Sequence, residues 1–175
     1  CYPISSMGSH VSVVPNHQLN RITSLHTRAN VAYFGTFGYE LDLNKLTDEE
    51  IAEVKAQIIF MKEYRELIQF GNFYRLKSPF DGNETVWMTV SEDKRKALVF
   101  WYRERNVVNA EFTRVRLQGL DPDLIYKNEY NGTENYGDEL MNLGLLTTDV
   151  TAGEPTNEDL PCTDYESRIY VLTAE

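Results

Sequence analysis

The hydrophobic pattern of this chain changes its period at Gly71, and this change limits the folds that the chain can adopt. Before Gly71 apolar residues recur at helical spacing, whereas after it they form short β-type runs separated by turn clusters such as Asp81-Gly82-Asn83. A helical first part followed by a strand-rich second part is typical of an α+β protein. We therefore expect two regions, residues 1–71 and residues 72–175.

The clearest predicted element is a long helix that begins after Thr47. Thr47 and Glu50 have the spacing of a capping box, and Leu46 and Ile51 flank it as a hydrophobic staple. Apolar residues then recur along one stripe until Gly71, which suits a helix end. The pattern predicts a helix of about twenty residues.

A second helix is predicted over Asn20 to Gly35, because apolar residues recur there at helical spacing: Ile22, Leu25, Ala29 and Ala32. The strands predicted after Gly71 cover Phe73 to Leu76, Thr85 to Val90, Ala97 to Tyr102, Phe112 to Leu117 and Arg168 to Leu172. The charged turn Glu92 to Arg95 separates two of them, which predicts a hairpin. The polar segment Thr147 to Thr163 is predicted to be a long exposed loop. The second region is therefore expected to be an antiparallel β domain.

Charge and composition exclude several classes of partner. The net charge is -10, from 17 Lys and Arg against 27 Asp and Glu, so nucleic acid and anionic membrane surfaces would repel the chain. No apolar run approaches the ~20 residues that a membrane span needs. We expect a soluble protein whose partners are neutral molecules or other proteins.

The two cysteines, Cys1 and Cys162, lie far apart in the sequence, which indicates neither a disulfide framework nor a thiolate zinc site. A reducing, cytoplasmic location is expected. Cys1 would also suit the nucleophile of an N-terminal-nucleophile hydrolase, with the chain's own amine as base. A chain cut from something longer is the favoured interpretation of this start.

The sequence offers few residues for metal or acid–base chemistry. The histidines are His10, His17 and His26, and no helix or strand would place all three on one face beside a carboxylate. No metal and no cofactor are therefore expected. Glu40 and Asp42 alternate on a short apolar run and form a candidate carboxylate pair, although a solvent-facing strand edge explains them as well.

The tryptophans suggest an alternative function. Trp87, Trp101 and several tyrosines could stack against sugar rings, which would make the second region a stand-alone carbohydrate-binding β-sandwich module. Aromatic residues in short strands are, however, more often part of a core. Such a module should fold alone from about Asn72 and bind galactosides, whereas a domain that closes a larger enzyme should not bind them once separated.

Several blocks in a fixed order resemble the C-terminal third of bacterial α-galactosidases of glycoside hydrolase family 36. They include the opening YPISSMGSHVSVVPNHQ and continue to the end of the chain: Tyr2 to Gln18, Arg21 to Leu43, Gln57 to Phe80, Leu117 to Pro122, Tyr136 to Gly144 and Ser167 to Leu172. The resemblance therefore covers nearly the whole chain. A match of many blocks is more specific than any single motif above.

The resemblance implies a definite fold. Residues 1–71 would form the C-terminal end of a (β/α)8 TIM barrel, with Ser6 to Val13 near its last strand, Asn20 to Gly35 as its last helix and Thr47 to Phe70 as the exit helix. Residues 72–175 would form the C-terminal antiparallel β-sandwich domain. The family is often tetrameric, so the resemblance also implies a homo-oligomer and contacts with the remainder of the same polypeptide.

The family's activity is retaining hydrolysis of terminal α-linked galactose, as in raffinose and melibiose, by two carboxylates. The family's K-W-D nucleophile motif and W-x-S-D-D acid/base motif do not occur in this sequence. The resemblance places both upstream of Cys1. No catalytic residue is therefore expected within this chain, which should be inactive alone.

The loop Val14 to Gln18 follows the expected last strand of the barrel, and active sites of such barrels lie at the C-terminal ends of the strands. We therefore expect His10, Asn16 and His17 to border the sugar pocket and hold its edge. The alternative, that Asn16 and His17 only cap the following helix, remains equally open at this point.

Overall fold

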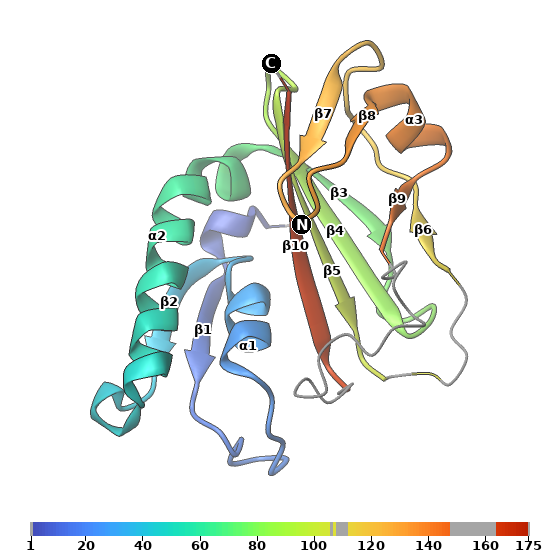
Figure 1. Ribbon diagram of the computed structural model, residues 1–175. Helices are drawn as coiled ribbons and strands as arrows, with labels where there is room; N and C mark the ends of the chain where they lie inside the picture. The colour runs from blue at the N-terminus through green and yellow to red at the C-terminus, as the bar shows by residue number, and fades with distance from the viewer. Residues whose placement is uncertain (1, 106, 108–111, 148–163, 175) are drawn as a thin grey trace. The chain divides into compact units, whose positions relative to one another are not determined.

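The computed structural model describes residues 2–105, 107, 112–147 and 164–174. They form a small α+β structure with a large antiparallel sheet, and the chain divides into two compact units, Cys1–Gly71 and Asn72–Glu175 (Figure 1). Across the described ranges, no helix is both long enough and apolar enough to cross a membrane.

Unit 1 alternates strands and helices. Its elements are η1 (Ile4–Ser6), β1 (Gly8–Ser12), α1 (Leu25–Ala32), β2 (Thr36–Glu40), η2 (Leu43–Lys45) and α2 (Asp48–Phe70). The strands β1 and β2 pair in parallel, with Gly8 opposite Thr36 and Ser12 opposite Glu40. Parallel strands need a crossover connection, and α1 supplies it. Unit 1 therefore contains two successive β/α pairs.

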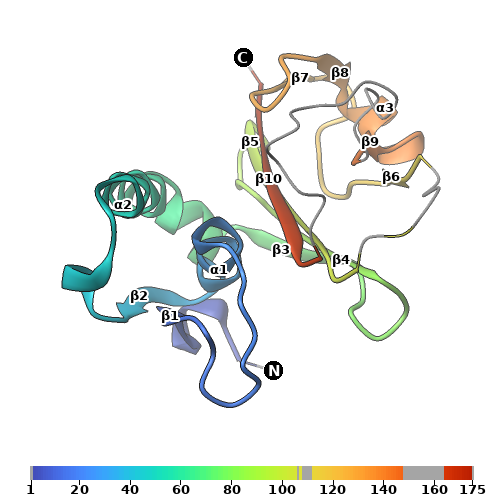
Figure 2. The same ribbon diagram turned by 60° about the horizontal axis from the view of Figure 1, so that its bottom comes forward.

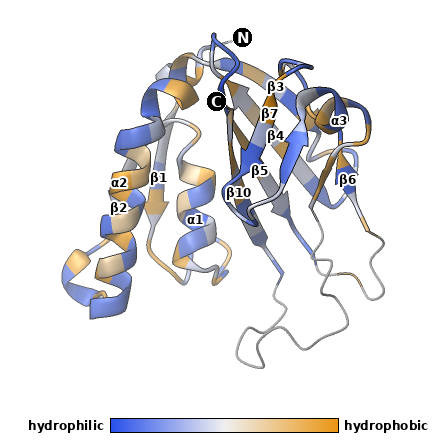
Figure 3. Ribbon diagram, turned by 45° about the horizontal axis from the view of Figure 1, so that its top comes forward, coloured by the Kyte–Doolittle hydropathy of each residue, from blue (hydrophilic) through white to orange (hydrophobic). Residues whose placement is uncertain are grey.

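The long helix is confirmed. Helix α2 begins after Thr47, whose side chain accepts a hydrogen bond from the Glu50 amide at 3.2 Å, while Glu50 Oε2 accepts one from the Thr47 amide at 2.9 Å. This is the predicted capping box. Polar and apolar stretches alternate along α2 (Figure 3). Its buried residues follow one stripe at helical spacing: Val54, Gln57, Met61, Tyr64 and Ile68.

The start predicted for the first helix is wrong. Helix α1 begins at Leu25 rather than Asn20, because Ser24 takes an extended ψ of 152° and caps it by accepting from the Thr27 amide at 3.0 Å. Asn20 has a φ of 52°, which no helix residue adopts. Ile22 consequently lies in the preceding loop and is 71% exposed. Strand β2 had not been predicted.

Unit 2 is built on antiparallel strands. Its elements are β3 (Asn72–Lys77), β4 (Glu84–Val90), β5 (Lys96–Arg103), β6 (Arg114–Val115), β7 (Ile125–Asn128), β8 (Glu134–Tyr136), α3 (Gly137–Asn142), β9 (Leu145–Leu146) and β10 (Glu166–Ala174). Six of these strands form one sheet in the order β3-β4-β5-β10-β7-β8, and β6 pairs with β9 in a small second sheet. The last strand of the chain therefore lies between β5 and β7.

One face of the large sheet packs against α3, β6 and β9 (Figures 1 and 2). Alternate residues of the central strands point into this contact, as the period of two in a strand requires. The core contains Val86, Met88, Val90, Ala97, Val99, Trp101, Val115, Leu117, Leu120, Tyr126, Leu140, Leu145, Tyr170 and Leu172. Unit 2 thus has one continuous hydrophobic core of its own.

Most predicted strands are present. The hairpin around Glu92 to Arg95 is confirmed, since β4 and β5 pair in register and the Ser91 amide donates to Lys96 O at 2.8 Å. The run Phe112 to Leu117 was too long a prediction, because only Arg114–Val115 pairs, with β9. Apart from Thr147, the predicted loop Thr147 to Thr163 lies outside the described residues.

Candidate functional site

Strands β1 and β2 carry a histidine and a carboxylate that face each other: His10 is the middle residue of β1, and Glu40 is the last residue of β2. His10 Nε2 lies 2.6 Å from Glu40 Oε2, and the two side chains are 53% and 73% exposed. An ion pair this exposed contributes little to stability, because water screens it. The pair therefore links the middle of β1 to the end of β2 and leaves both groups accessible to solvent.

Asn16 organises the turn that follows β1. Its backbone amide donates to Arg21 O at 2.9 Å, and its Oδ1 accepts from the amides of Gln18 and Leu19 at 3.0 Å each. His17 is exposed within the same turn. Among the described residues no hydrogen bond or ion pair links His10 to Asn16 or His17. The structure thus brings Asn16 and His17 together and places His10 on the strand before them.

The alternative that Asn16 caps the following helix is wrong, because Ser24 holds that position in α1. Asn16 caps its own turn instead.

Arg28 of α1 fixes the loop between β1 and α1. Its Nη1 donates to Ser12 O at 2.5 Å, and its Nε donates to Thr23 O and Ser24 O at 3.3 Å each. Burial lowers the pKa of the Arg28 guanidinium, while the nearby carboxylates of Glu50 and Glu53 act in the opposite direction. Both ends of the loop that carries Asn16 and His17 are therefore held by one side chain, which the sequence pattern did not single out.

A polar chain joins β2 to α2. Tyr39 OH donates to Gln57 Oε1 at 2.8 Å, and Gln57 Nε2 donates to Glu53 Oε1 at 2.8 Å. Burial, together with the negative charge of Glu53, raises the pKa of Tyr39 to about 12. The phenol therefore stays protonated and serves as a hydrogen-bond donor that positions β2.

The candidate carboxylate pair does not assemble. Glu40 contacts His10, whereas Asp42 caps η2 by accepting from Asn44 N at 3.1 Å and Asn44 Nδ2 at 3.0 Å. These hydrogen bonds lower the pKa of Asp42. A capping carboxylate with a lowered pKa is poorly suited to act as a general acid.

Two other candidates give no site. In the described part of the chain, no group of three His, Cys, Asp or Glu residues could hold a metal ion. His26 Nε2 instead lies 3.0 Å from Asn30 Nδ2 within α1. Cys1 and Cys162 lie outside the described residues.

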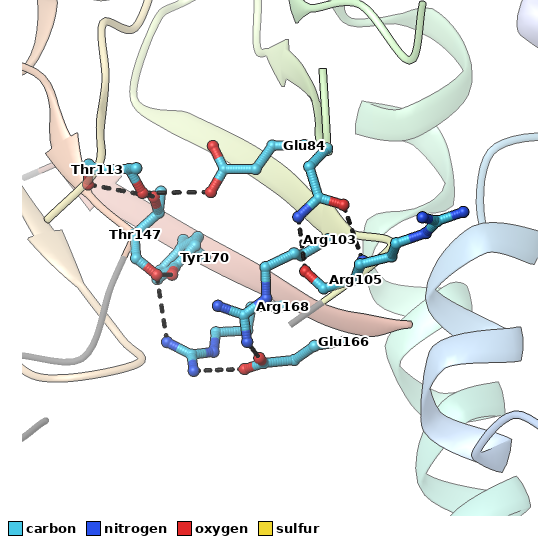
Figure 4. Close-up of polar contacts among 9 residues, drawn as sticks. Glu84, Arg103, Arg105, Thr113, Thr147, Glu166, Arg168 and Tyr170 are labelled. Carbon is cyan, nitrogen blue, oxygen red and sulfur yellow. Dashed lines mark hydrogen bonds and ion pairs between the residues drawn. The ribbon is translucent and has the colours of Figure 1, made fainter. Parts of the chain in front are cut away.

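Unit 2 contains a network of arginines at one end of its sheet (Figure 4). Arg103 and Arg168 both form ion pairs with Glu166, and Arg168 Nη1 also donates to Thr147 O at 3.4 Å. The two guanidinium groups lie 5.3 and 5.4 Å from the centre of the Trp101 ring. These contacts brace β5 against β10.

One of the two tryptophans does not have the surface role considered for it. Trp101 is 1% exposed and belongs to the core, so its ring has no open face of the kind that stacks on a sugar. Trp87 is half-buried and contacts Phe73 and Tyr102.

Family models match both units. Residues 1–71 match the model described as Melibiase, and residues 84–172 match the Glycosyl hydrolase family 36 C-terminal domain. The chain is 53% identical over 144 residues to alpha-galactosidase AgaA of Geobacillus stearothermophilus, which covers 82% of this chain and 20% of that protein. It is 46% identical over 144 residues to the bifunctional alpha-galactosidase/sucrose kinase AgaSK of Mediterraneibacter gnavus, covering 82% of this chain and 15% of that protein.

Solved structures of α-galactosidases are also similar to this chain. The crystal structure of AgaA from Geobacillus stearothermophilus matches 99% of this chain with a TM-score of 0.89 and 46% identity, and the match covers 23% of that protein. Variants of AgaA with the same TM-score were solved in complex with raffinose and with stachyose. The chain thus spans 20% and 15% of the lengths of these two curated relatives.

Proposed function

The chain belongs to glycosyl hydrolase family 36, and from this premise we propose that it is the C-terminal part of an α-galactosidase. The complete enzyme would release terminal α-linked galactose, with retention at the anomeric carbon, from galactosides of the raffinose or melibiose type. The observation that carries this proposal is the order of the two family matches, Melibiase over residues 1–71 and the family 36 C-terminal domain over residues 84–172.

We assign unit 1 to the end of the (β/α)8 barrel. Its parallel strands β1 and β2, each followed by a helix, are the repeating unit of such a barrel. On this proposal α2 is the helix of the second pair as well as the exit from the barrel. Unit 2, with its antiparallel sheet and the small β6–β9 sheet, would be the C-terminal β-sandwich domain. The boundary between the two domains would fall after Gly71.

In this assignment the present chain completes and stabilises the barrel and does not supply the reacting carboxylates. The nucleophile and the acid/base would come from other parts of the enzyme, in keeping with the absence of the K-W-D and W-x-S-D-D motifs from this sequence. The proposal includes a homo-oligomeric, cytoplasmic enzyme that needs no cofactor.

We further propose that His10, Asn16 and His17 border the sugar pocket. Active sites of barrels lie at the carboxyl ends of the strands. Glu40 is the last residue of β2, the Asn16 turn follows β1, and His10, in the middle of β1, contacts Glu40. Arg28 holds the loop in place. Asn16 would act through the position of the turn, whereas the exposed His10 and His17 rings are the groups able to reach other residues or a sugar.

One experiment tests the function directly. The full-length protein is incubated with raffinose and with melibiose, and proton NMR follows the anomer of galactose that appears first. We expect α-galactose before mutarotation, because two displacements at the anomeric carbon restore its configuration. Release of β-galactose first, or no release, would contradict the proposal.

A second experiment tests the pocket border. His17→Ala in the full-length protein should raise KM or lower kcat with little change in melting temperature, since His17 is exposed. Unchanged kinetic constants in a stable protein would remove His17 from the proposed border.

A further inference from the structure

The connection between β1 and α1 has no hydrophobic core of its own. Residues 13–23, which we call the β1–α1 loop, join the end of β1 to the residue that caps α1 (Figure 1). None of these residues is buried in the described structure, and the apolar side chains of Val13, Leu19 and Ile22 are 50%, 67% and 71% exposed. Within this chain the position of the loop therefore depends on hydrogen bonds and not on apolar burial.

One guanidinium group holds both ends of the loop. Arg28 Nη1 donates to Ser12 O at 2.5 Å, at the last residue of β1, and Arg28 Nε donates to Thr23 O at 3.3 Å, at the other end. A guanidinium group is planar and rigid, so its nitrogen atoms keep a fixed spacing. Arg28 therefore fixes the distance between the two ends of the β1–α1 loop.

A separate set of hydrogen bonds shapes the tip of the loop. The Asn16 amide donates to Arg21 O at 2.9 Å, and the Asn20 amide donates to Asn16 O at 2.7 Å. Both bonds lie inside the loop, so they fix the shape of the tip that carries His17 but not its orientation relative to β1. The contacts of Arg28 at the two ends of the loop supply that orientation.

The surroundings of Arg28 allow its charge and its shape to be tested separately. The side chain is half-buried, and burial lowers the pKa of the guanidinium, while Glu50 and Glu53 of α2 act in the opposite direction. A lysine at this position would keep a positive charge near both carboxylates. Its ammonium group is, however, a single point on a flexible stem and cannot reproduce two donors at a fixed spacing.

We propose that Arg28 is a positioning residue for substrate binding: it holds the β1–α1 loop so that the tip with Asn16 and His17 is ready to receive the galactoside. This inference rests on the proposed function and on the proposed place of the loop at the border of the sugar pocket. Without Arg28 the loop would adopt several arrangements, and the apparent affinity would fall by the fraction of molecules in the competent one. Bound substrate selects that arrangement, so turnover of the complex would change little.

The first test measures KM and kcat for melibiose in the full-length protein. Arg28→Lys and Arg28→Gln should each raise KM about three- to tenfold and leave kcat within about twofold, because each loses the rigid pair of donors. The matched control is Arg65→Lys, which changes an exposed arginine of α2 and should leave both constants unchanged. A merely structural role would instead lower the amount of active enzyme, which reduces the apparent kcat and leaves KM unchanged.

The second test does not depend on activity. In full-length Arg28→Gln, the amides of residues 13–23 should exchange hydrogen about three- to tenfold faster than in the unchanged protein, because the loop opens more often. Amides of β5, which lies in unit 2, should keep their rates. Unchanged exchange in the loop would show that Arg28 does not hold it and would overturn the proposal.

The remaining outcomes are also decisive. An unchanged KM in the Arg28 variants would overturn the proposal, even if exchange in the loop is faster, and so would an equal rise of KM in Arg65→Lys. A normal KM in Arg28→Lys beside a raised KM in Arg28→Gln would assign the effect to charge and contradict the role of the rigid donors. If one Arg28 variant fails to fold, the KM of the other decides. If the unchanged protein releases no galactose, the proposed function fails, while the exchange comparison still shows whether Arg28 holds the loop.

Discussion

The two units bury their apolar residues in different ways. In unit 2 most buried apolar side chains form one continuous cluster between the large sheet and the elements α3, β6 and β9. Leu98 and Phe100 are buried outside this cluster, and Phe80 is 93% exposed. Unit 1 buries a stripe of α2 and part of α1, but leaves large apolar side chains exposed: Leu19 at 67%, Ile22 at 71%, Ile59 at 65% and Phe70 at 75%. The continuous core therefore distinguishes unit 2, because both units leave some large apolar side chains exposed.

The sheets of the two units show the same contrast. The β1–β2 sheet has two parallel strands, each with one edge that has no partner strand among the described residues. Parallel sheets occur almost only inside larger structures that cover both faces. The six-stranded sheet of unit 2 has four strands with partners on both sides. Among the described residues, both strands of the β1–β2 sheet are therefore edge strands, whereas only β3 and β8 are edge strands in the six-stranded sheet.

The largest expected effect comes from separating the units. Residues 72–175 expressed alone should give a cooperative thermal transition and bind little hydrophobic dye, because their core is internal. Residues 1–71 alone should bind the dye strongly and aggregate, because apolar side chains and strand edges remain exposed. Circular dichroism melts and dye fluorescence of the two polypeptides provide the measurement. A cooperative melt of residues 1–71 without dye binding would contradict this expectation, because both units would then fold alone.

A cavity in the core of unit 2 should have the next largest effect. Leu172 is 1% exposed in the central strand β10, so Leu172→Ala should lower the free energy of unfolding by about 2–5 kcal/mol. Ile59→Ala on the exposed side of α2 should change it by no more than about 0.5 kcal/mol. Urea unfolding of the 175-residue chain measures both. Similar losses in the two variants would mean that Ile59 is covered in solution.

Crowding at one glycine should have a smaller but still clear effect. A Cβ atom built on Gly137 would lie 1.9 Å from the backbone oxygen of Asp121, which cannot move as a flexible side chain can. Gly137→Ala should therefore destabilise unit 2 by about 1–3 kcal/mol. Gly82 has no atom within 4 Å of such a Cβ and serves as the control. Thermal melts of residues 72–175 with each change test this, and equal melting temperatures would contradict it.

The sequence-based predictions were most accurate for elements that are defined by local signals such as caps and turns. Both ends of α2 follow from its capping box and from Gly71, and the β4–β5 hairpin follows from one charged turn between two apolar runs. Helix α1 was placed too early because Ile22 continues the helical spacing, while the positive φ of Asn20 has no signal in that pattern. Strand β2 was missed because its partner β1 lies across a helix, and parallel pairing leaves no turn to recognise.

The candidate site shows the same limit. The sequence indicated that His10 lies on or near a strand and that Asn16 and His17 lie in the loop after it; in the structure His10 is the middle residue of β1 and the other two follow that strand. That the three border a sugar pocket stays a prediction. The contact of His10 with Glu40 depends on the register of β1 and β2, which no local pattern specifies. Arg28 reaches Ser12 O across the same loop for the same reason. Contacts between distant segments were therefore the part that could not be predicted.

The smallest expected effect concerns the capping box of α2, and it tests whether the loss of this local hydrogen bond destabilises unit 1 alone. Thr47→Ala removes the acceptor for the Glu50 amide and should cost about 1 kcal/mol. In the full-length protein, hydrogen exchange of the Glu50 amide should then accelerate about fivefold, while amides of the central strand β5 keep their protection. Local fraying at the first turn of α2 is the expected physical cause, because the rest of the helix retains its buried stripe.

Glu50→Gln is the matched control, since a capping box accepts glutamine in place of glutamate and the hydrogen bond to the Thr47 amide survives. Its exchange rates should stay close to those of the unchanged protein. If Thr47→Ala instead accelerates exchange in β5 by the same factor, the cap stabilises both units together, and the separation between a locally specified unit 1 and a core-stabilised unit 2 would have to be abandoned.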